Sequence, residues 1–328
     1  MIDVIIYGLG PIGARIARRV MSDAGLRMAG AVDIDPEKVG RDLGAATGGE
    51  PAGLPVVADI ATLGVREKGA VAVHCAASSL AIAAPQVIAL CERGFNVVST
   101  CEQLAWPHDQ LDMAASIDRA ARTAGVSVIG SGINPGFLLD TLPLVLSAVC
   151  TRVEHVTVRR VVDTSVRRLP LQRKTGVGLS VDEFRARAAA GTLGHVGLRQ
   201  SALMLADGLG ATIDEYSETI EPVIAQAAVA TALGEVPAGA CVGQRQVAIA
   251  STNGRPVIRY ELEMSIGATP FDEIEIDGDP PVRQRIEGGV QGDIGTEGVI
   301  VNLIPVVSAA APGLLTMRDL FPVSGRLA

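Results

Sequence analysis

Aromatic residues are scarce in this chain, making up 3% of 328 residues with a single tryptophan. The stacking platforms that bind single-stranded nucleic acid are therefore not expected. Positive charge is also in the minority, because 28 lysines and arginines face 36 acidic residues and leave a net charge of −8. That balance argues against nucleic acid or an anionic membrane as a partner.

Long hydrophobic runs are missing as well. No apolar run reaches the roughly 18 residues that a membrane span needs. The first residues enter a strand pattern without a basic segment or a signal-like apolar stretch. We therefore expect a cytoplasmic protein with no membrane partner.

Cysteine and histidine occur in patterns that fit neither a disulfide framework nor a metal site. The five cysteines are an odd number without a C-x-x-C pair, which is typical of buried thiols in a reducing compartment. The four histidines contain no H-x-x-x-H pair, so no metal is expected.

Apolar residues are abundant, at 48%, and the length predicts two domains. Up to residue 136, strand and helix patterns alternate, which predicts a doubly wound parallel sheet with helices on both faces. The expected strands are Val4–Tyr7, Met28–Asp33, Val71–Ala76, Asn96–Thr100 and Val126–Gly130. The expected helices are Ile12–Ala24, Leu80–Arg93 and Leu111–Ala124.

The pattern changes after Pro135 to strands separated by turn residues. This predicts an α+β domain with a mainly antiparallel sheet, in which Asn253 and Gly254 form a hairpin turn. The expected strands are Val153–Val162, Gln244–Ser251, Val257–Gly267, Phe271–Asp277 and Val282–Glu287, and Gly278–Pro281 is expected to be a loop.

Three further helices are expected. Ser180 and Glu183 form a capping box at the start of a helix that should end near Gly191. A second helix should run from about residue 195 to residue 209, and a last one from about residue 293 to residue 310, returning to pack on the first domain. We therefore expect a dinucleotide-binding domain of residues 1–136, completed by residues 293–328, and a substrate and oligomerisation domain of residues 137–292.

The most informative motif is a glycine turn directly after the first strand. Its sequence is Gly-Leu-Gly-Pro-Ile-Gly, and an acid, Asp33, follows the last glycine by 20 residues at the end of the second strand. This spacing indicates a Rossmann-type site, with a tight turn, close approach of a pyrophosphate and a closely packed helix whose N-terminus meets the phosphates. The expected cofactor-binding residues of the turn are Gly8, Gly10, Pro11, Ile12 and Gly13.

Asp33 bears on the choice of cofactor. A carboxylate there would accept hydrogen bonds from the adenosine ribose and repel a 2′-phosphate, so NAD is slightly favoured over NADP. Lys38 and Arg41 are near enough in sequence to weaken this preference. A loop or helix-capping acid is the alternative interpretation of Asp33.

Residues that follow the other parallel strands are the remaining candidates, because such sheets bind ligands at the carboxyl ends of their strands. The expected contacts are Ala76, Ala77 and Ser78, then Cys101 and Glu102, then Asn134 and Pro135. Asn134 is expected to contact substrate as well as cofactor. An ordinary turn between domains is the alternative for Asn134 and Pro135.

Glu102 is the sharpest catalytic candidate. A carboxylate at a strand end can serve as a general base or bind a cation, although it can also be a surface acid. Its neighbour Cys101 could attack a carbonyl if its pKa were lowered, but a buried packing thiol is the commoner outcome. Side-chain alternation predicts that only one of the two faces the cofactor.

Substrate contacts are expected in the second domain. A basic cluster between residues 159 and 174 could bind a carboxylate or form a solvated surface. His195 could be an acid, a base, a hydrogen-bonding group or a structural residue. The substrate candidates are Arg168, Gln172 and His195.

Five segments together resemble one family of enzymes. They are Val98–Glu102, Gly130–Phe137 (GSGINPGF), Arg167–Lys174 (RRLPLQRK), Gly191–Leu198 (GTLGHVGL) and Gly288–Asn302. In order and spacing they are similar to the 2,4-diaminopentanoate dehydrogenases and the native amine dehydrogenases, which share the fold of dihydrodipicolinate reductase. Where a more Thr-rich stretch would be expected, the segment His74–Ser79 reads His-Cys-Ala-Ala-Ser-Ser.

The resemblance implies an NAD(P)-dependent oxidoreductase that converts an amine into a carbonyl compound and ammonia, or runs the reverse reductive amination. It places the key glutamate of the family at Glu102, and it implies a homodimer or a larger homo-oligomer. The chemistry of a carboxylate fits this role, because it can take or relay the proton of an ammonium group and stabilise an iminium cation.

Two other functions stay open at this point. A reductase of an imine or unsaturated substrate on the same fold would need a cationic acid such as His195 or Lys174. A non-catalytic dinucleotide sensor would bind the cofactor without turnover.

Overall fold

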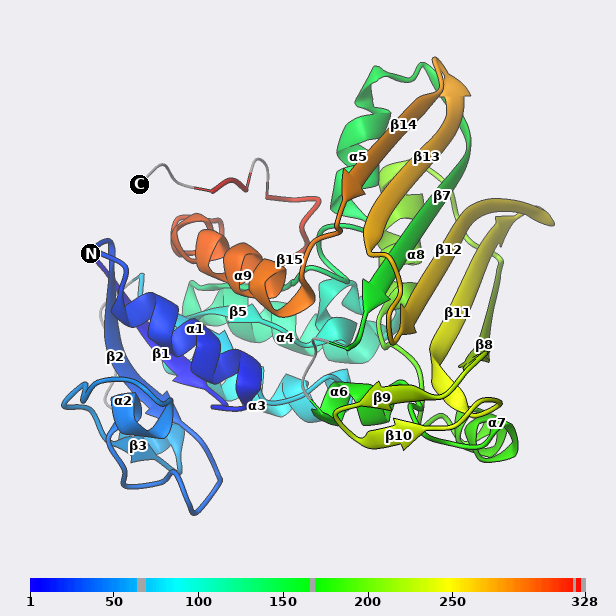
Figure 1. Ribbon diagram of the computed structural model, residues 1–328. Helices are drawn as coiled ribbons and strands as arrows, with labels where there is room; N and C mark the ends of the chain where they lie inside the picture. Colours follow the sequence, from blue (N-terminus) through cyan, green and yellow to red (C-terminus); the bar gives the residue numbers. More distant parts are fainter. Residues whose placement is uncertain (64–68, 166–168, 321–322, 326–328) are drawn as a thin grey trace. The chain divides into compact units, whose positions relative to one another are not determined.

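The chain forms two units, each with its own sheet and core. The computed structural model describes residues 1–63, 69–165, 169–320 and 323–325 (Figure 1). The first unit comprises Met1–Phe137 and Gly292–Ala328, and the second comprises Leu138–Gln291.

The first unit is built on a seven-stranded parallel sheet of order β15-β6-β5-β4-β1-β2-β3. Its strands are β1 (Ile2–Tyr7), β2 (Leu26–Val32), β3 (Val56–Val57), β4 (Val71–His74), β5 (Asn96–Ser99), β6 (Ser127–Gly130) and β15 (Gly313–Leu315). The chain proceeds from β1 to β2 in one direction and from β4 to β6 in the other. The carboxyl ends of β1 and β4 therefore form a switch point, where such sheets bind ligands.

Helices cover both faces of this sheet because right-handed crossovers in opposite directions place their helices on opposite sides. Helix α1 (Pro11–Met21) packs beside α9 (Gly292–Ser308), and α3 (Leu80–Glu92) packs beside α4 (Leu111–Ala124) (Figure 1). Since α9 also contacts β4, β5 and β6, the last helix returns to the first unit as expected. The short helices are α2 (Leu43–Ala46), η1 (Ile60–Thr62), η2 (Glu102–Ala105) and η3 (Pro107–Asp109).

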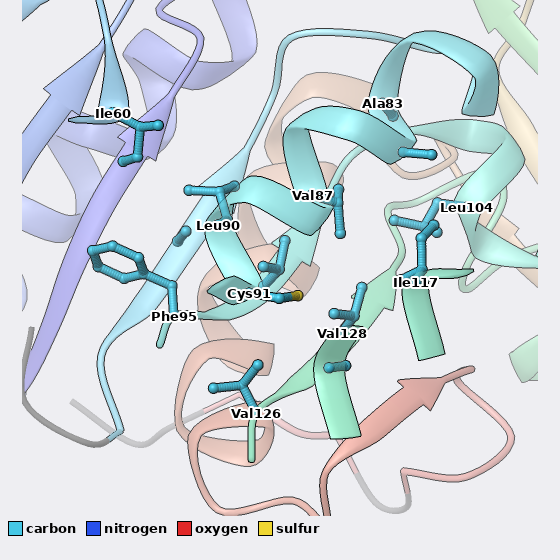
Figure 2. Packing of buried hydrophobic residues seen from close by; sticks show 14 of the residues in the cluster. Ile60, Ala83, Val87, Leu90, Cys91, Phe95, Leu104, Ile117, Val126 and Val128 are labelled. Carbon is cyan, nitrogen blue, oxygen red and sulfur yellow. The ribbon is translucent and has the colours of Figure 1, made fainter. Parts of the chain in front are cut away.

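The core beneath α3 and α4 is mainly aliphatic, as the scarcity of aromatic residues requires. Figure 2 shows Val87 and Cys91 of α3 gathered over Val128 of β6, with Ile117 of α4 nearby. Phe95 is fully buried in the same cluster. Complete burial of such side chains stabilises the fold by roughly 1.5–3 kcal/mol each.

The second unit contains a six-stranded sheet of order β14-β13-β7-β12-β11-β8. Its strands are β7 (Arg152–Asp163), β8 (Glu215–Ile224), β11 (Cys241–Thr252), β12 (Arg255–Ser265), β13 (Phe271–Asp279) and β14 (Val282–Glu287), and a separate small sheet pairs β9 (Val229–Thr231) with β10 (Gly234–Val236). The sheet is mainly antiparallel, but β7 and β12 are parallel neighbours. Strand direction across such a pair depends on the long connection between them, which local sequence patterns do not encode.

Helices of the second unit follow the expected pattern only in part. They are α5 (Thr141–Leu146), η4 (Ser147–Val149), α6 (Leu169–Lys174), α7 (Val181–Ala189) and α8 (Leu198–Gly208). The capping box is confirmed, because the Glu183 N–H donates to Ser180 Oγ and the Ser180 N–H to Glu183 Oε2. The expected helix start at His195 is wrong: α8 begins at Leu198, after Gly197 adopts a φ of 107°.

Two turns between strands can be compared with those that the sequence predicts. Asn253 and Gly254 have φ angles of 52° and 72°, as a type I′ hairpin turn between β11 and β12 requires. The expected loop at residues 278–281 begins later, since Gly278 and Asp279 still pair in β13. Among the described residues, no helix is long and apolar enough to cross a membrane.

Candidate active site

The glycine turn has the geometry that its spacing predicts. Gly8 has a φ of 96°, and a Cβ there would lie 3.0 Å from backbone atoms of Cys75 and Ala76. A Cβ on Gly13 would lie 1.9 Å from the Gly8 carbonyl oxygen. Two of the three glycines are therefore fixed by close packing where β1, β4 and α1 meet.

Gly10 differs from the other two because a Cβ there would meet nothing within 4 Å. It is the N-cap residue of α1, lacks a side-chain cap and precedes Pro11 at the first helical position. The half-buried Ile12 follows. Open space beside the backbone, at the positive end of an 11-residue helix, fits a pyrophosphate group.

Asp33 lies beside this turn, directly after β2. Its Oδ2 accepts a hydrogen bond of 2.6 Å from the N–H of Leu9, and its Oδ1 accepts one of 2.8 Å from the N–H of Asp35. Lys38 Nζ lies 3.5 Å from Asp33 Oδ2. The carboxylate therefore holds the turn in place and has a cation next to it.

The loop after β4 lies against both β1 and the segment after β5. Its Cys75 N–H donates to the Tyr7 carbonyl at 2.7 Å. Ala76 and Ser78 are exposed and Ala77 is half-buried, so the backbone of this short loop is accessible. The Ser78 carbonyl accepts from Cys101 Sγ at 3.2 Å and from the Gln103 N–H at 3.4 Å.

Glu102 begins η2 and is half-buried. Both of its neighbours are tied to the β4–α3 loop, because Gln103 Oε1 also accepts from the Leu80 N–H at 2.7 Å. A Cβ on Gly130 would lie 2.3 Å from the Leu104 carbonyl carbon, so η2 packs directly on β6. The backbone on each side of Glu102 is therefore fixed.

A buried hydrogen-bond relay, from His74 through Ser99 to the backbone of Cys101, also supports this segment. His74 stacks on Tyr7, with ring centroids 5.5 Å apart, and its Nε2 lies 2.8 Å from Gln86 Oε1. Because that oxygen can only accept, Nε2 carries the proton and Nδ1 accepts from the Ser99 hydroxyl, 2.8 Å away. Ser99 Oγ in turn accepts from the Cys101 N–H at 3.1 Å. Burial lowers the pKa of His74, which keeps the ring neutral.

Cys101 is 1% exposed, and burial raises the pKa of its thiol to about 11. A thiol with this pKa is protonated at neutral pH and is a poor nucleophile. The geometry therefore gives Cys101 a packing role beside Glu102 and disfavours covalent catalysis.

The loop after β6 contains Asn134 and Pro135, joined by a cis peptide bond. A Cβ on Gly136 would lie 2.5 Å from the Gly132 nitrogen, so this loop is tightly folded. The Ile133 N–H donates to Thr296 Oγ1 of α9 at 3.4 Å. The end of β6 and the start of α9 are thus held together within the first unit.

In the second unit, His195 lies in the loop before α8 and is half-buried. The side-chain amide of Gln246 fixes its backbone: Gln246 Oε1 accepts from the His195 N–H at 2.7 Å, and Gln246 Nε2 donates to the His195 carbonyl at 3.0 Å. Gln246 Nε2 also donates to Glu218 Oε1 at 2.6 Å. Gln246 is fully buried, and no sequence motif distinguishes it.

Gln172 is fully buried on α6, where its Nε2 donates to the Ser165 carbonyl at 3.3 Å. Arg168 lies outside the described residues. Within the described ranges there is no group of three or more His, Cys, Asp or Glu side chains that could hold a metal ion.

The candidates of the first unit thus share one edge of its sheet, since all follow the carboxyl ends of parallel strands. Direct contacts join the turn after β1 to the β4 loop and Asp33, and that loop to the segment of Glu102. Sequence reasoning missed His74, Ser99 and Gln86, because a polar residue inside an apolar pattern gives no sign of its partners.

Comparisons with known proteins identify relatives of this chain. Residues 137–327 match the 2,4-diaminopentanoate dehydrogenase C-terminal domain family. The chain is 31% identical to 2,4-diaminopentanoate dehydrogenase of Acetoanaerobium sticklandii, with 97% of this chain and 93% of the relative covered. It is 25% identical to an amine dehydrogenase of Streptomyces virginiae, with 100% and 99% covered.

Solved structures give the same result. The amine dehydrogenase of Mycobacterium smegmatis superposes with a TM-score of 0.85 at 26% identity, covering 99% of this chain and 97% of the other. A dihydrodipicolinate reductase from Paenisporosarcina has a TM-score of 0.52 at 14% identity, covering 97% and 99%, and shows the shared fold alone.

Fold and relatives define an oxidoreductase with a Rossmann-type unit and a mixed-sheet second unit. The chain belongs to the 2,4-diaminopentanoate dehydrogenase family.

Proposed function

We propose that this enzyme is an NAD(P)-dependent amine dehydrogenase, which oxidises a primary amine or diamino acid to a carbonyl compound and ammonia. The single observation that carries the proposal is the fixed position of Glu102, whose two neighbours are both hydrogen-bonded to the β4–α3 loop beside the glycine turn. Relatives named for 2,4-diaminopentanoate and for amines support this substrate class.

A nicotinamide dinucleotide fits the turn, because the backbone of Gly10 is open to a ligand whereas Gly8 and Gly13 are closely packed. When bound, this cofactor would accept a hydride from the amine carbon. Gly8–Gly13 would bind the pyrophosphate. Further contacts would come from residues 76–78 and residues 101, 134 and 135.

Asp33 would bind the adenosine ribose, which favours NAD. Lys38, 3.5 Å from Asp33, offers a cation to a 2′-phosphate, so binding of NADP is also compatible with this site. Ile34 follows directly and is 86% exposed. We assign Ile34 to the adenine ring, as an apolar contact that sequence reasoning did not identify.

Glu102 would bind the amino group of the substrate and remove its proton. An alkylammonium has a pKa near ~10.4, so it holds its proton at neutral pH and has no lone pair to assist hydride loss. A carboxylate attracts the ammonium group and relays its proton to solvent. Once ionised again, it stabilises the iminium cation that hydride loss leaves. Substrate contacts would come from Asn134, Gln172 and His195, together with Arg168.

The test is cofactor reduction at 340 nm and alkaline pH with a panel of amines, comparing the wild-type enzyme with Glu102→Gln. We expect kcat to fall at least about 100-fold in the variant while the dissociation constant of NADH stays within about twofold. Asp109→Asn, a nearby exposed acid after η2, is the matched control and should keep full activity.

Other results would assign other functions. Cofactor binding without turnover of any amine would favour a sensor, and turnover of cyclic imines alone would favour a reductase. Full activity in Glu102→Gln would contradict the role of Glu102 but not the reaction class. We also propose a homodimer or larger homo-oligomer, which sedimentation equilibrium would test.

A further inference from the structure

A groove opens between helices α3 and α4 of the first unit, on the side that faces solvent. Its volume is about 550 Å³, and its lining comes from the last turns of α3 and from the middle and end of α4. The two helices pack beside each other within one unit. Sites for small molecules have volumes of roughly 300–1,000 Å³, so this groove is large enough for one.

The floor of the groove is apolar. Residues four apart lie on the same side of a helix, so Ala120 and Ala124 follow each other along α4 and leave space above their short side chains. Ile88 of α3 lines the same space. Ile88 and Ala120 also pack against the apolar core beneath. The floor is therefore continuous with the core and can bury an aliphatic group.

Each wall of the groove carries one charged side chain, and the two charges are opposite in sign. Glu92 lies in the last turn of α3 and Arg119 lies on α4, and both are exposed. Among the described residues neither one forms an ion pair, whereas Arg122, also on α4, is paired with Asp118 at 2.8 Å. Both charges in the groove are therefore available to a ligand.

Hydroxyl groups lie on both sides of Arg119. Ser116 precedes it by three residues and Thr123 follows it by four, which makes both of them its neighbours on the surface of α4. Ser116 Oγ donates to the Asp112 carbonyl at 2.8 Å. The Thr123 hydroxyl can donate to an anion that the guanidinium holds. This combination of donors suits a carboxylate.

The pair of charges selects among small ligands. A phosphate or a simple carboxylate would approach Arg119 but would meet the like charge of Glu92. A simple amine would approach Glu92 but would leave the guanidinium unpaired. A zwitterion with an aliphatic side chain satisfies both walls and the floor.

We infer that this groove binds a free aliphatic amino acid as a zwitterion. Its ammonium group would lie at Glu92 and its carboxylate at Arg119. Its side chain would cover Ile88, Ala120 and Ala124. This site goes beyond the proposed function and does not depend on it.

The groove is separate from the catalytic candidates. Leu80, the first residue of α3, is bonded to Gln103, the neighbour of Glu102. The 13 residues of α3 extend over roughly 20 Å, and the groove lies along the last turns. A ligand there would therefore be bound in addition to the substrate and the cofactor.

The test is calorimetric titration of the full-length enzyme with L-leucine at pH 7, where leucine is a zwitterion. We expect one molecule per chain with a Kd of about 1 mM. Glu92→Gln and Arg119→Met should each weaken binding about fivefold, which is the upper range for an exposed ion pair. Because both side chains are exposed, the melting temperature should stay within about 1 °C.

Two analogues assign each charge to its partner. 4-Methylpentanoate lacks the amino group of leucine, and its weaker binding should respond to Arg119→Met but not to Glu92→Gln. 3-Methylbutylamine lacks the carboxylate, and its weaker binding in the groove should respond to Glu92→Gln but not to Arg119→Met. This crossed pattern is specific to a site in which the two charges bind different groups of one ligand.

Matched controls come from the same unit. Asp112→Asn removes an exposed carboxylate from the first turn of α4, and Arg19→Met removes an exposed guanidinium from α1. Both residues lie outside the groove, and neither change should alter leucine binding. Ala124→Phe fills the groove while both charges stay in place, and it should abolish leucine binding.

Three results would overturn this site. The first is the absence of saturable binding up to about 20 mM leucine. The second is binding that Glu102→Gln abolishes and the groove variants leave unchanged, because leucine would then occupy the catalytic site. The third is self-association in sedimentation experiments that the groove variants abolish, without any leucine binding, because the groove would then contact a second copy of the chain.

Discussion

The hydroxyl of Ser99 connects a buried histidine to the backbone beside Glu102. It donates to His74 Nδ1 and accepts from the Cys101 N–H, so it transmits the position of β4 to the start of η2. None of these groups needs to touch a ligand in order to affect catalysis. A displacement of Glu102 by about 1 Å can cost roughly 100-fold in rate.

Removing the relay should therefore lower kcat rather than cofactor affinity. We expect His74→Leu and Ser99→Ala to reduce kcat roughly tenfold or more, with the dissociation constant of NADH unchanged within about twofold. His74→Asn, whose Oδ1 can still accept from Ser99, should recover much of the loss. Hydrogen exchange of the peptide containing Cys101 should be faster in the first two variants, and equal exchange with full kcat would refute the relay.

At the scale of single residues, the sequence indicates some candidate site residues but not the contacts of others. Glu102 and Asp33 could be proposed as candidates because each follows a predicted parallel strand, where such sheets bind their ligands. The hydrogen bonds of Gln246 to His195 and Glu218 could not be predicted, because a polar residue in a strand acquires its partners only through sheet register and helix packing.

Among the elements, the glycine turn combines two requirements: close packing of the backbone and open space beside it for a ligand. Gly13 is needed for packing, since its Cβ would lie 1.9 Å from a backbone oxygen, whereas Gly10 faces open space. The two glycines should therefore respond differently to the same substitution. Gly10 has a φ of −61°, which alanine adopts without strain.

We expect Gly13→Ala to lower the melting temperature by about 5 °C or more, because the turn or α1 must shift. Gly10→Ala should leave the melting temperature unchanged within about 1 °C and weaken NADH binding about tenfold, since its methyl group would occupy pyrophosphate space. Scanning calorimetry and fluorescence titration measure the two effects. Normal NADH affinity in Gly10→Ala would exclude the phosphate site at this turn.

Elements with strong local signals were predictable. Helix α4 and strand β14 have the predicted bounds, and the capping box before α7 forms as expected. Strand β8, residues 215–224, was missed because it is an edge strand whose side chains are mostly polar. The parallel pairing of β7 and β12 was missed because only the complete topology determines it.

For the molecule as a whole, acid stability should depend on a charge network in the second unit. The Glu273 side chain is 4% exposed and accepts hydrogen bonds from Arg283 and Arg159 at 2.9 Å each and from Arg285 at 3.2 Å. Hydrogen bonds from these guanidinium groups, Arg283 foremost, lower its pKa from 4.5 to about 2. The folded state therefore holds this carboxylate ionised at pH values where the unfolded chain is already protonated.

Because the folded pKa is the lower one, the stabilisation is complete above pH 4.5 and is lost as the pH falls toward 2. We expect Glu273→Gln to lower the melting temperature at pH 7 by roughly 5 °C and to flatten its decline between pH 4.5 and 2. Circular dichroism melts over this range measure both effects. Parallel curves for variant and wild type would show that Glu273 does not carry the acid sensitivity.

The first unit is discontinuous, with the whole second unit inserted between β6 and α9. On the ribosome, β4, β5 and β6 emerge long before α9, the helix that covers them. At roughly 5–20 residues per second, synthesis of the remaining chain takes on the order of 10 to 40 seconds. During that interval the nascent first unit exposes an apolar sheet face, whereas the continuous second unit can close its core first. We therefore expect the nascent first unit to need protection by chaperones, and the second unit to complete its core first.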